Sequence, residues 1–367
     1  MPQRLLFLYL EERSFVTDDL EALGKAYEVR HQSFSNDGSP NALRFLRQCL
    51  RQLAWLLREV RRSDAILGWF ADYHMVLPVL VAKLFRKPVL VSLGGFDCIY
   101  MPELDYGVFT SSWRAPLARF VHRNADLLLP VTAALLRQVD RYVRWPEERV
   151  DGLLVHLPDL KTRVEVLPTG YDPDLWAMGP LDRVPSVRTV ANVDSMRTAR
   201  RKGIDLFVEV ARMIPDVPFE VVGVRDRMAE SLKRALDPPA NVGLRGPVVR
   251  ASLPALYAET SVYAQLSRAE GMPNVLCEAM LCGCIPVASR VYGNPDAVGG
   301  AGILVDTPEP ERIAVAVRNA LLMRGEARQA ARNHIVERFT RRHRYDKLAR
   351  LIEELTVTHA QASRSGE

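Results

Sequence analysis

Two carboxylates, Glu270 and Glu278, bracket the predicted start of a helix. A strand-like run ends at Ser267, Pro273 suits the first position of a helix, and Gly283 is suited to end it. Amide groups at a helix N-terminus lack intrahelical acceptors and favour an anion such as a phosphate. The spacing therefore predicts a site for a phosphorylated ligand between two carboxylates, although an ordinary strand-loop-helix connection would have the same pattern.

A basic loop, Asn192 to Gly203, is the second element that could do chemistry. It gathers four cations just before a predicted helix: Arg197, Arg200, Arg201 and Lys202. Facing the helix N-terminus at Met272–Val275, these side chains would form a clamp for a diphosphate. Charge-assisted hydrogen bonds of this kind contribute about 1.5–3 kcal/mol each. The alternative is a basic loop that is simply solvated.

Length and composition bound the protein that positions these residues. A chain of 367 residues predicts two domains, because single cores rarely grow beyond about 250–300 residues. The hydrophobic fraction of 48% and the charged fraction of 25% are those of a globular protein. The net charge of +5 comes mostly from arginine, which suits phosphorylated ligands or anionic lipid headgroups. No basic tract interleaved with aromatic residues argues for a nucleic-acid partner.

Cysteine usage and hydropathy indicate the compartment. The five cysteines include the close pair Cys282 and Cys284, which lack the further Cys and His residues of a complete metal-binding set nearby. We expect reduced thiols in a cytoplasmic protein and no metal site. No stretch approaches 18 apolar residues, so any membrane contact is expected to be peripheral.

Apolar runs alternate with helix-length segments throughout the first half of the chain. The predicted strands are Leu5–Leu10, Tyr27–Arg30, Ala65–Phe70, Pro88–Leu93, Asp126–Val131 and Arg163–Leu167. Such runs imply a parallel sheet covered by helices on both faces. Ligands of these sheets bind at the carboxyl ends of the strands. Two loops there stand out, Phe70–His74 and Ser92–Asp97, the second of which runs on into Pro102–Gly107.

The second half repeats this alternation after a proline-rich connection between Pro168 and Pro185. Its predicted strands are Arg188–Val193, Phe219–Val224, Val242–Gly246, Ser261–Ser267, Ile285–Ser289 and Gly302–Asp306, and its predicted final helices are Pro310–Arg324 and Ala327–Leu355. We expect domains at 1–170 and 171–335, a C-terminal helix at 336–355 that packs back on the first domain, and a disordered tail at 356–367. The Asp172–Asp174 carboxylates spell D-x-D, but they lie in a proline-rich turn without a second ligand set.

The segment Asn41–Arg62 is predicted to be an amphipathic helix. Its apolar stripe is Leu43, Leu46, Leu50, Leu53, Leu57 and Val60, and arginines surround it. The favoured interpretation is a helix that packs on the sheet through this stripe and exposes a solvated basic face. The alternative is a basic amphipathic face that touches an anionic membrane.

Several segments, in order, resemble those of the family-four retaining glycosyltransferases. Glu270–Gly283 resembles the signature E-G-[FM]-P-N-V-x-x-E-A-M-x-x-G, and Arg201–Asp205 resembles the phosphate-binding segment R/K-K-G-x-D. Val164–Asp172 is similar to the family's P-x-G-x-D interdomain strand, which supports discounting the D-x-D pattern. Asn124–Thr132 is similar to a family segment that begins with A-D and ends in Ser or Thr. The loop Gly94–Gly107 is similar to that of a bacterial subgroup.

The resemblance implies a GT-B fold, in which two Rossmann-like, doubly wound parallel-sheet α/β domains face a central cleft. It implies that Glu270 and Lys202 with Arg201 or Arg197 act on the sugar and the diphosphate of a nucleotide-sugar donor. Donor-binding residues would be Gly271, Met272, Pro273, Asn274, Val275, Leu276 and Glu278, with Glu278 on the ribose. It implies retention by same-face attack without a metal or a cofactor, so Glu270 is not a nucleophile.

Two departures from the family pattern affect the assignments. Ala191-Asn192 stands where many members have an arginine, so Arg197 or Arg201 takes that role. No histidine follows Val91-Ser92-Leu93, and the candidates for the acceptor side are His74, Gly94, Gly95 and Asp97.

We expect a hexosyltransferase that acts on a glycan or glycolipid acceptor in cell-envelope glycolipid, lipopolysaccharide or exopolysaccharide synthesis. We expect the protein to be cytoplasmic and to bind peripherally at the inner face of the cell membrane. Two alternatives remain, a sugar-nucleotide epimerase on the same fold and a non-catalytic nucleotide-sugar-binding module. Release of a nucleoside diphosphate that depends on an acceptor separates the three.

Overall fold

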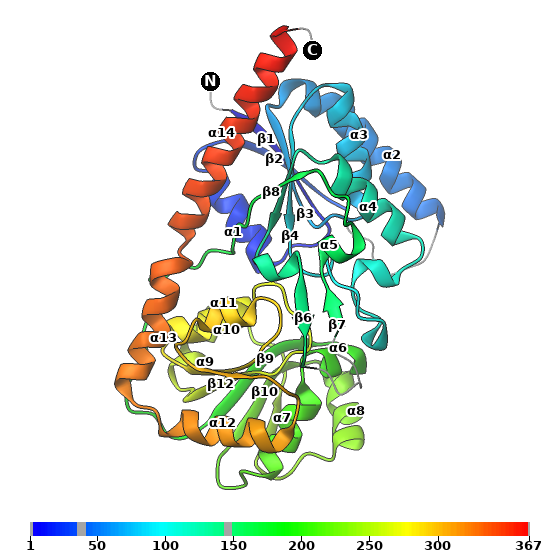
Figure 1. Ribbon diagram of the computed structural model, residues 1–367. Coiled ribbons are helices and arrows are strands. Elements are labelled where there is room, and N and C mark those ends of the chain that lie inside the picture. The colour runs from blue at the N-terminus through cyan, green and yellow to red at the C-terminus, as the bar shows by residue number, and fades with distance from the viewer. Residues whose placement is uncertain (1–2, 35–41, 143–148, 366–367) are drawn as a thin grey trace.

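A computed structural model describes residues 3–34, 42–142 and 149–365 of the chain, with side chains described as far as residue 362. Two α/β domains lie one above the other in Figure 1, and a long C-terminal helix runs along the side of the first. Each domain is built on a six-stranded sheet whose strands are all parallel. The predicted architecture of two Rossmann-like domains is confirmed.

The first sheet has the strand order β2-β1-β3-β4-β5-β8. Its strands are β1 (Arg4–Tyr9), β2 (Glu28–Ser33), β3 (Ala65–Trp69), β4 (Val89–Leu93), β5 (Leu127–Pro130) and β8 (Arg163–Val164). The four central strands are almost wholly buried, as their continuous apolar runs predicted. Its main helices are α1 (Ser14–Leu23), α2 (Ala42–Glu59), α3 (Val76–Leu84) and α4 (Arg114–Asn124).

The second sheet has the order β11-β10-β9-β12-β13-β14. Its strands are β9 (Val187–Val193), β10 (Phe219–Val224), β11 (Val242–Arg245), β12 (Val262–Gln265), β13 (Ile285–Ser289) and β14 (Ile303–Val305). Its helices are α6 (Met196–Arg201), α7 (Ile204–Arg212), α8 (Asp226–Leu236), α9 (Leu253–Ala258), α10 (Asn274–Leu281), α11 (Asn294–Val298) and α12 (Pro310–Leu322). All predicted strands are present. Pro273 caps α10 from an extended conformation (ψ 100°) and is not its first helical residue.

The C-terminal segment contains two helices where one was predicted, α13 (Gly325–Arg338) and α14 (Arg341–Ser365). The break has a backbone cause in the interdomain connection. Tyr171 donates its amide to Phe339 O, and its carbonyl accepts the Arg341 amide, so these groups are not used within a helix. Helix α14 packs on the first domain, where Lys347 donates to Val166 O and Arg163 pairs with Glu354.

The prediction of a disordered tail from residue 356 is wrong as far as residue 365, because α14 continues to Ser365. His359 lies against the first domain, 3.2 Å from an oxygen of Asp126. Two short strands outside the sheets were also not predicted. They are β6 (Gln138–Asp140) and β7 (Arg149–Asp151), which pair with each other in antiparallel fashion.

Helix α2 contradicts the favoured interpretation of its leucine stripe. Leu43, Leu46, Leu50 and Leu57 are 74%, 54%, 58% and 44% exposed. The helix instead buries Gln52 and Leu56 and half-buries the residues near them. Four of the six stripe residues therefore face solvent, whereas Leu53 is half-buried and Val60 is buried, and part of the packing face is polar.

Candidate functional site: a cavity between the two domains

A cavity of about 280 Å³ lies between the domains. From the first domain it is lined by residues of the loops that follow β1, β3, β4, β5 and β8, and from the second by the loops before α7 and α10. The lining residues are Arg13, Ser14, Phe15, Trp69, Phe70, Gly94, Tyr106, Val131, Thr169, Lys202, Glu270, Gly271, Met272, Pro273, Asn274 and Val275. The cavity therefore occupies the carboxyl ends of the strands, where parallel sheets bind ligands.

Lys202 and Glu270 form an ion pair in this cavity, with Nζ and Oε1 2.5 Å apart. Gln265 Nε2 donates to the same carboxylate oxygen at 2.8 Å. Gly203 allows the loop that carries Lys202 to pack directly against the backbone of Leu266. Its φ is +70°, and a Cβ there would lie 2.0 Å from Leu266 O. The close backbone contact brings a cation and a carboxylate from distant segments into one site.

The charge states of this pair follow from burial and from neighbouring cations. Burial opposes ionisation of Glu270, but Lys202 and Arg201 outweigh it and hold the pKa of that carboxyl below its usual value. Burial also lowers the pKa of Lys202, against the opposing effect of Glu270. Glu270 is therefore an ionised acceptor at neutral pH. An added anion beside Lys202 would favour the charged ammonium.

The N-terminus of α10 forms one wall of the cavity through Asn274 and Val275. Pro273 O accepts the amides of Leu276 and Cys277, so the two amides before them have no acceptor within the helix. Leu276 is buried and does not line the cavity. Its predicted phosphate contact stays a prediction, whereas Asn274 and Val275 already lie at the cavity wall.

The two arginines predicted for the diphosphate, Arg197 and Arg201, differ in their position relative to the cavity. Arg197 is exposed and pairs with Asp105 of the first domain, outside the cavity lining. Arg201 lies with its guanidinium 4.4 Å from the ring centre of Tyr106, which does line the cavity. Arg13, which precedes α1, lines the cavity directly and was missed. Of the arginines predicted for the diphosphate, Arg201 is the better placed.

Asp97 and His74 are internal supports in this structure. Asp97 is fully buried, and its carboxylate accepts the amides of Ala71, Gly94 and Gly95 at 3.0–3.1 Å. Burial raises its pKa to about 6, against these hydrogen bonds. His74 is also fully buried, with Nε2 3.0 Å from Trp69 O, and burial lowers its pKa to about 4. Neither side chain lines the cavity, so both predicted acceptor contacts lack support here.

Gly94 and Gly95 lie where the two domains meet. Gly94 lines the cavity, and Gly95 adopts φ +122°. A Cβ on Gly271 would lie only 2.0 Å from Gly94 O, so the two loops touch through their backbones. Asp97 thus fixes a loop that forms the interdomain contact.

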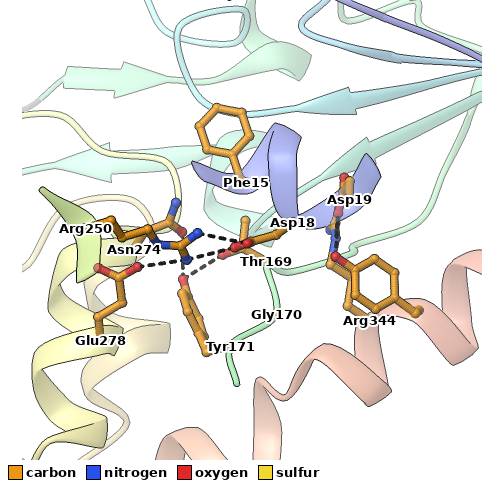
Figure 2. A pocket seen from close by; sticks show the side chains of 11 residues that line it. Phe15, Asp18, Asp19, Thr169, Gly170, Tyr171, Arg250, Asn274, Glu278 and Arg344 are labelled. Atoms are coloured by element: carbon orange, nitrogen blue, oxygen red, sulfur yellow. Dashed lines mark hydrogen bonds and ion pairs between the residues drawn. The ribbon is translucent and has the colours of Figure 1, made fainter. Parts of the chain in front are cut away.

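Glu278 lies outside this cavity and lines a separate, smaller one of about 10 Å³ (Figure 2). It is 3% exposed, and burial raises its pKa to about 7. Arg250 Nη2 lies 3.4 Å from Glu278 Oε1. Phe15, Thr169 and Asn274 line both cavities, so the small one adjoins the large one.

Among the described residues, no group of three or more His, Cys, Asp or Glu side chains is arranged to hold a metal ion. In the same part of the chain no helix is long and apolar enough to cross a membrane.

Comparison with known proteins identifies the second domain. Residues 187–322 match the family model of the glycosyl transferases group 1. The second domain is therefore similar to the glycosyl transferases group 1. The match spans β9 to α12 and includes Lys202, Glu270 and Glu278.

Three curated relatives extend the likeness. The chain is 25% identical over 165 residues to one component of the phosphatidylinositol N-acetylglucosaminyltransferase of Arabidopsis thaliana. It is 30% identical over 183 residues to a GDP-mannose-dependent phosphatidylinositol monomannoside mannosyltransferase of Mycolicibacterium smegmatis. It is 27% identical over 290 residues to a D-inositol 3-phosphate glycosyltransferase of Segniliparus rotundus. These matches cover 43%, 43% and 73% of this chain but only 36%, 47% and 59% of the relatives.

Solved structures share the fold of the whole chain. HepE of Anabaena, solved with UDP and glucose, has a TM-score of 0.70 at 18% identity, over 96% of this chain and 99% of its own. Sucrose-phosphate synthase of Thermosynechococcus elongatus has a TM-score of 0.73 at 16% identity, over 97% and 100%. The GT-B fold is thereby confirmed, and the match of residues 187–322 to the glycosyl transferases group 1 supports the family resemblance. The subgroup assignment from the Gly94–Gly107 loop stays a prediction.

The residues that sequence reasoning missed come from the first domain. They are Arg13, Ser14, Phe15, Trp69, Val131 and Thr169. A common signal could have found most of them, because they stand at or shortly after the ends of predicted strands. Tyr106 belongs to a loop that the sequence singled out, but its place beside Arg201 is known only from the folded structure.

Proposed function

We propose that this protein is a retaining glycosyltransferase, which moves a sugar from a nucleoside-diphosphate sugar to an acceptor hydroxyl. The observation that carries the proposal is the Lys202–Glu270 pair beside the α10 N-terminus, in a cavity between two sheets. Glycosyl transfer develops positive charge on the sugar ring and negative charge on the departing diphosphate. An ionised carboxylate next to cations and free amides matches both charges.

The diphosphate would lie against the α10 N-terminus, where Asn274 and Val275 present amides. Lys202 and Arg13 line the same cavity, and Arg201 lies next to it on Tyr106. These groups are fixed before reaction, so they can stabilise the leaving group without reorganising and without a metal. Loss of one such group costs about 10²–10³ in rate in comparable oxyanion sites.

Glu270 would accept hydrogen bonds from hydroxyls of the transferred sugar. Its low pKa makes it unsuited to donate a proton at neutral pH. One of its oxygens already accepts from both Lys202 and Gln265, which hold the carboxylate in place. We therefore infer same-face attack by the acceptor, with the departing phosphate taking the proton, and no covalent intermediate on Glu270.

The acceptor would be a glycolipid or polysaccharide precursor of the cell envelope. Three curated relatives are named for phosphatidylinositol, a phosphatidylinositol monomannoside or inositol 3-phosphate, which supports an acceptor with a phosphorylated polyol. We propose that the enzyme works in the cytoplasm, peripherally on an anionic membrane surface.

The surface of α2 and α3 supports that location. Helix α3 packs beside α2 and also exposes leucines, Leu80 and Leu84, and Trp113 near α4 is 55% exposed. Four exposed arginines accompany the stripe on α2, and its acidic residue is Glu59 at the end of the helix. An apolar stripe with a basic border suits the boundary between anionic headgroups and acyl chains.

A nucleotide panel followed by a turnover assay tests the function. UDP, GDP and ADP are compared by thermal shift, since a ligand at 100 times its dissociation constant adds about 2.7 kcal/mol of stability. The matching sugar nucleotides are then assayed for nucleoside-diphosphate release with and without phosphatidylinositol vesicles or inositol 3-phosphate. Acceptor-dependent release is expected. Turnover of the sugar nucleotide without any acceptor would favour an epimerase, and binding without turnover a non-catalytic module.

A further inference from the structure

Arg250 contacts Glu278 in this structure, at one oxygen of its carboxylate. The cavity beside it has room for no more than about one water molecule. The guanidinium of Arg250 lies between Glu278 and a carboxylate of the other domain, Asp18 on α1 (Figure 2). A ligand that takes this oxygen of Glu278 from the adjoining cavity must therefore displace Arg250.

The two carboxylates hold Arg250 unequally. Asp18 accepts two hydrogen bonds from it, at 2.8 and 2.9 Å, in a bidentate pair. The contact with Glu278 is a single one at 3.4 Å. Bidentate arginine–carboxylate pairs are the stronger kind. Arg250 can therefore leave Glu278 and stay bound, provided that Asp18 is in place.

The position of Asp18 depends on domain closure. Asp18 lies on the first domain and Arg250 in the second, so their pair exists only when the domains approach each other. Arg341, at the start of α14, also donates to Asp18 at 2.7 Å and keeps that carboxylate buried and oriented. Closure thus supplies the alternative anchor for Arg250.

We propose that Asp18 is a positioning residue for donor binding: it draws Arg250 away from Glu278, so that the ribose hydroxyls of the nucleotide can take the place of the guanidinium. This inference rests on the proposed function and on the ribose contact of Glu278. It adds that ribose binding and domain closure are coupled through one shared arginine. If Asp18 is neutralised, Glu278 is the one carboxylate of the two that still attracts Arg250. The ribose hydroxyls then compete less well with the guanidinium for Glu278.

The test measures how strongly the protein distinguishes a ribonucleotide from its dideoxy counterpart. The probes are whichever of UDP, GDP and ADP binds, and the 2′,3′-dideoxy form of the same diphosphate, titrated by calorimetry at pH 8 so that Glu278 is ionised. Wild type is expected to prefer the ribonucleotide about tenfold or more, since hydrogen bonds to charged groups are strong. Asp18→Asn should reduce this preference to about threefold or less.

Adding Arg250→Gln to Asp18→Asn should restore the ribonucleotide preference, which would not happen if Asp18 had only a structural role. Because no cation then covers Glu278, both Arg250→Gln and the double variant Asp18→Asn/Arg250→Gln should keep the wild-type preference. Asp159→Asn is the matched control, an aspartate that pairs with two bonds to Arg123 within the first domain. It should behave as wild type.

Each other outcome overturns a distinct statement. An unchanged preference in Asp18→Asn, or a loss that persists in the double variant, overturns the positioning role. Loss of the preference in Arg250→Gln alone means that Arg250 itself holds the ribose. If wild type binds a diphosphate with no preference, the ribose contact of Glu278 and this inference fail while diphosphate binding stands. If none of the three diphosphates binds, the proposed function fails as well.

Discussion

Lys202 and Glu270 are 68 residues apart in the chain, and their side chains meet at 2.5 Å in the cleft. The carboxylate comes from the loop before α10 and the ammonium from the loop before α7. Both are largely buried, so the low local dielectric strengthens their effect on a bound ligand. Under the proposed function, the pair places opposite charges where the sugar and its departing diphosphate would separate.

Lys202→Ala is expected to reduce nucleoside-diphosphate release by about 10²–10³, since a fixed cation at the leaving group is lost. Release is measured with the donor identified in the nucleotide panel. Lys233→Ala is the matched control, because that lysine is exposed on α8 of the same domain and pairs with the neighbouring Glu230. A Lys202 variant that keeps its fold and wild-type turnover would contradict the site described here.

Gly271→Ala should hold the domains apart, because the new Cβ would lie 2.0 Å from Gly94 O. We expect a larger radius of gyration by small-angle scattering and turnover lower by about 100-fold, the scale of a misplacement of about 1 Å. The clash is between domains, so each domain should still fold. Gly243→Ala, where the nearest atoms are 3.8 Å away, should change neither quantity. Unchanged scattering from Gly271→Ala would show that the loops can separate without cost.

Glu278 should make stability fall as pH rises. Its folded pKa of about 7 lies above the ordinary value of 4.5. Between these values the unfolded chain releases a proton that the folded chain keeps, so the free energy of unfolding decreases with pH. Glu278→Gln removes this effect. Its melting temperature relative to wild type should therefore be higher at pH 8 than at pH 5.

The control for that comparison is Glu354→Gln. Arg163 holds the pKa of Glu354 below its usual value through a hydrogen bond, so this carboxylate is ionised in both states from pH 5 to 8. Its relative melting temperature should not depend on pH in this range. The same flat result for Glu278→Gln would mean that burial does not keep Glu278 protonated.

Leu46→Glu/Leu50→Glu should abolish binding to vesicles that contain phosphatidylglycerol, measured by flotation at low salt. These leucines are more than half exposed, so their replacement should leave the melting temperature nearly unchanged. Val315→Glu/Leu322→Glu, with exposed apolar residues on α12 of the second domain, is the matched control and should still bind. Wild-type binding should weaken as salt screens the arginines. Equal flotation of both variants would exclude α2 as the contact.

The sequence alone determined the elements and the chemistry of the donor side. Continuous apolar runs at strand length specify buried parallel strands in any fold, because both of their faces must be covered. The segment from Glu270 to Gly283 places a carboxylate, a helix start and a glycine stop by local rules that need no tertiary partner. The break between α13 and α14 escaped such rules, because it depends on the distant backbone of Tyr171.

Only the tertiary structure decided which of the candidate side chains face the cavity. The sequence does not distinguish Arg197 from Arg201 as the diphosphate ligand. In the structure Arg197 pairs with Asp105, whereas Arg201 lies over the ring of Tyr106 beside the cavity. The sequence makes Asp97 a candidate for the acceptor side. In the structure its carboxylate instead accepts backbone amides 2 and 26 residues away and supports the loop from inside. The leucine stripe of α2 has the same period whether it faces a sheet or solvent. Periodicity specifies that a helix has two faces, and only packing specifies which one is covered.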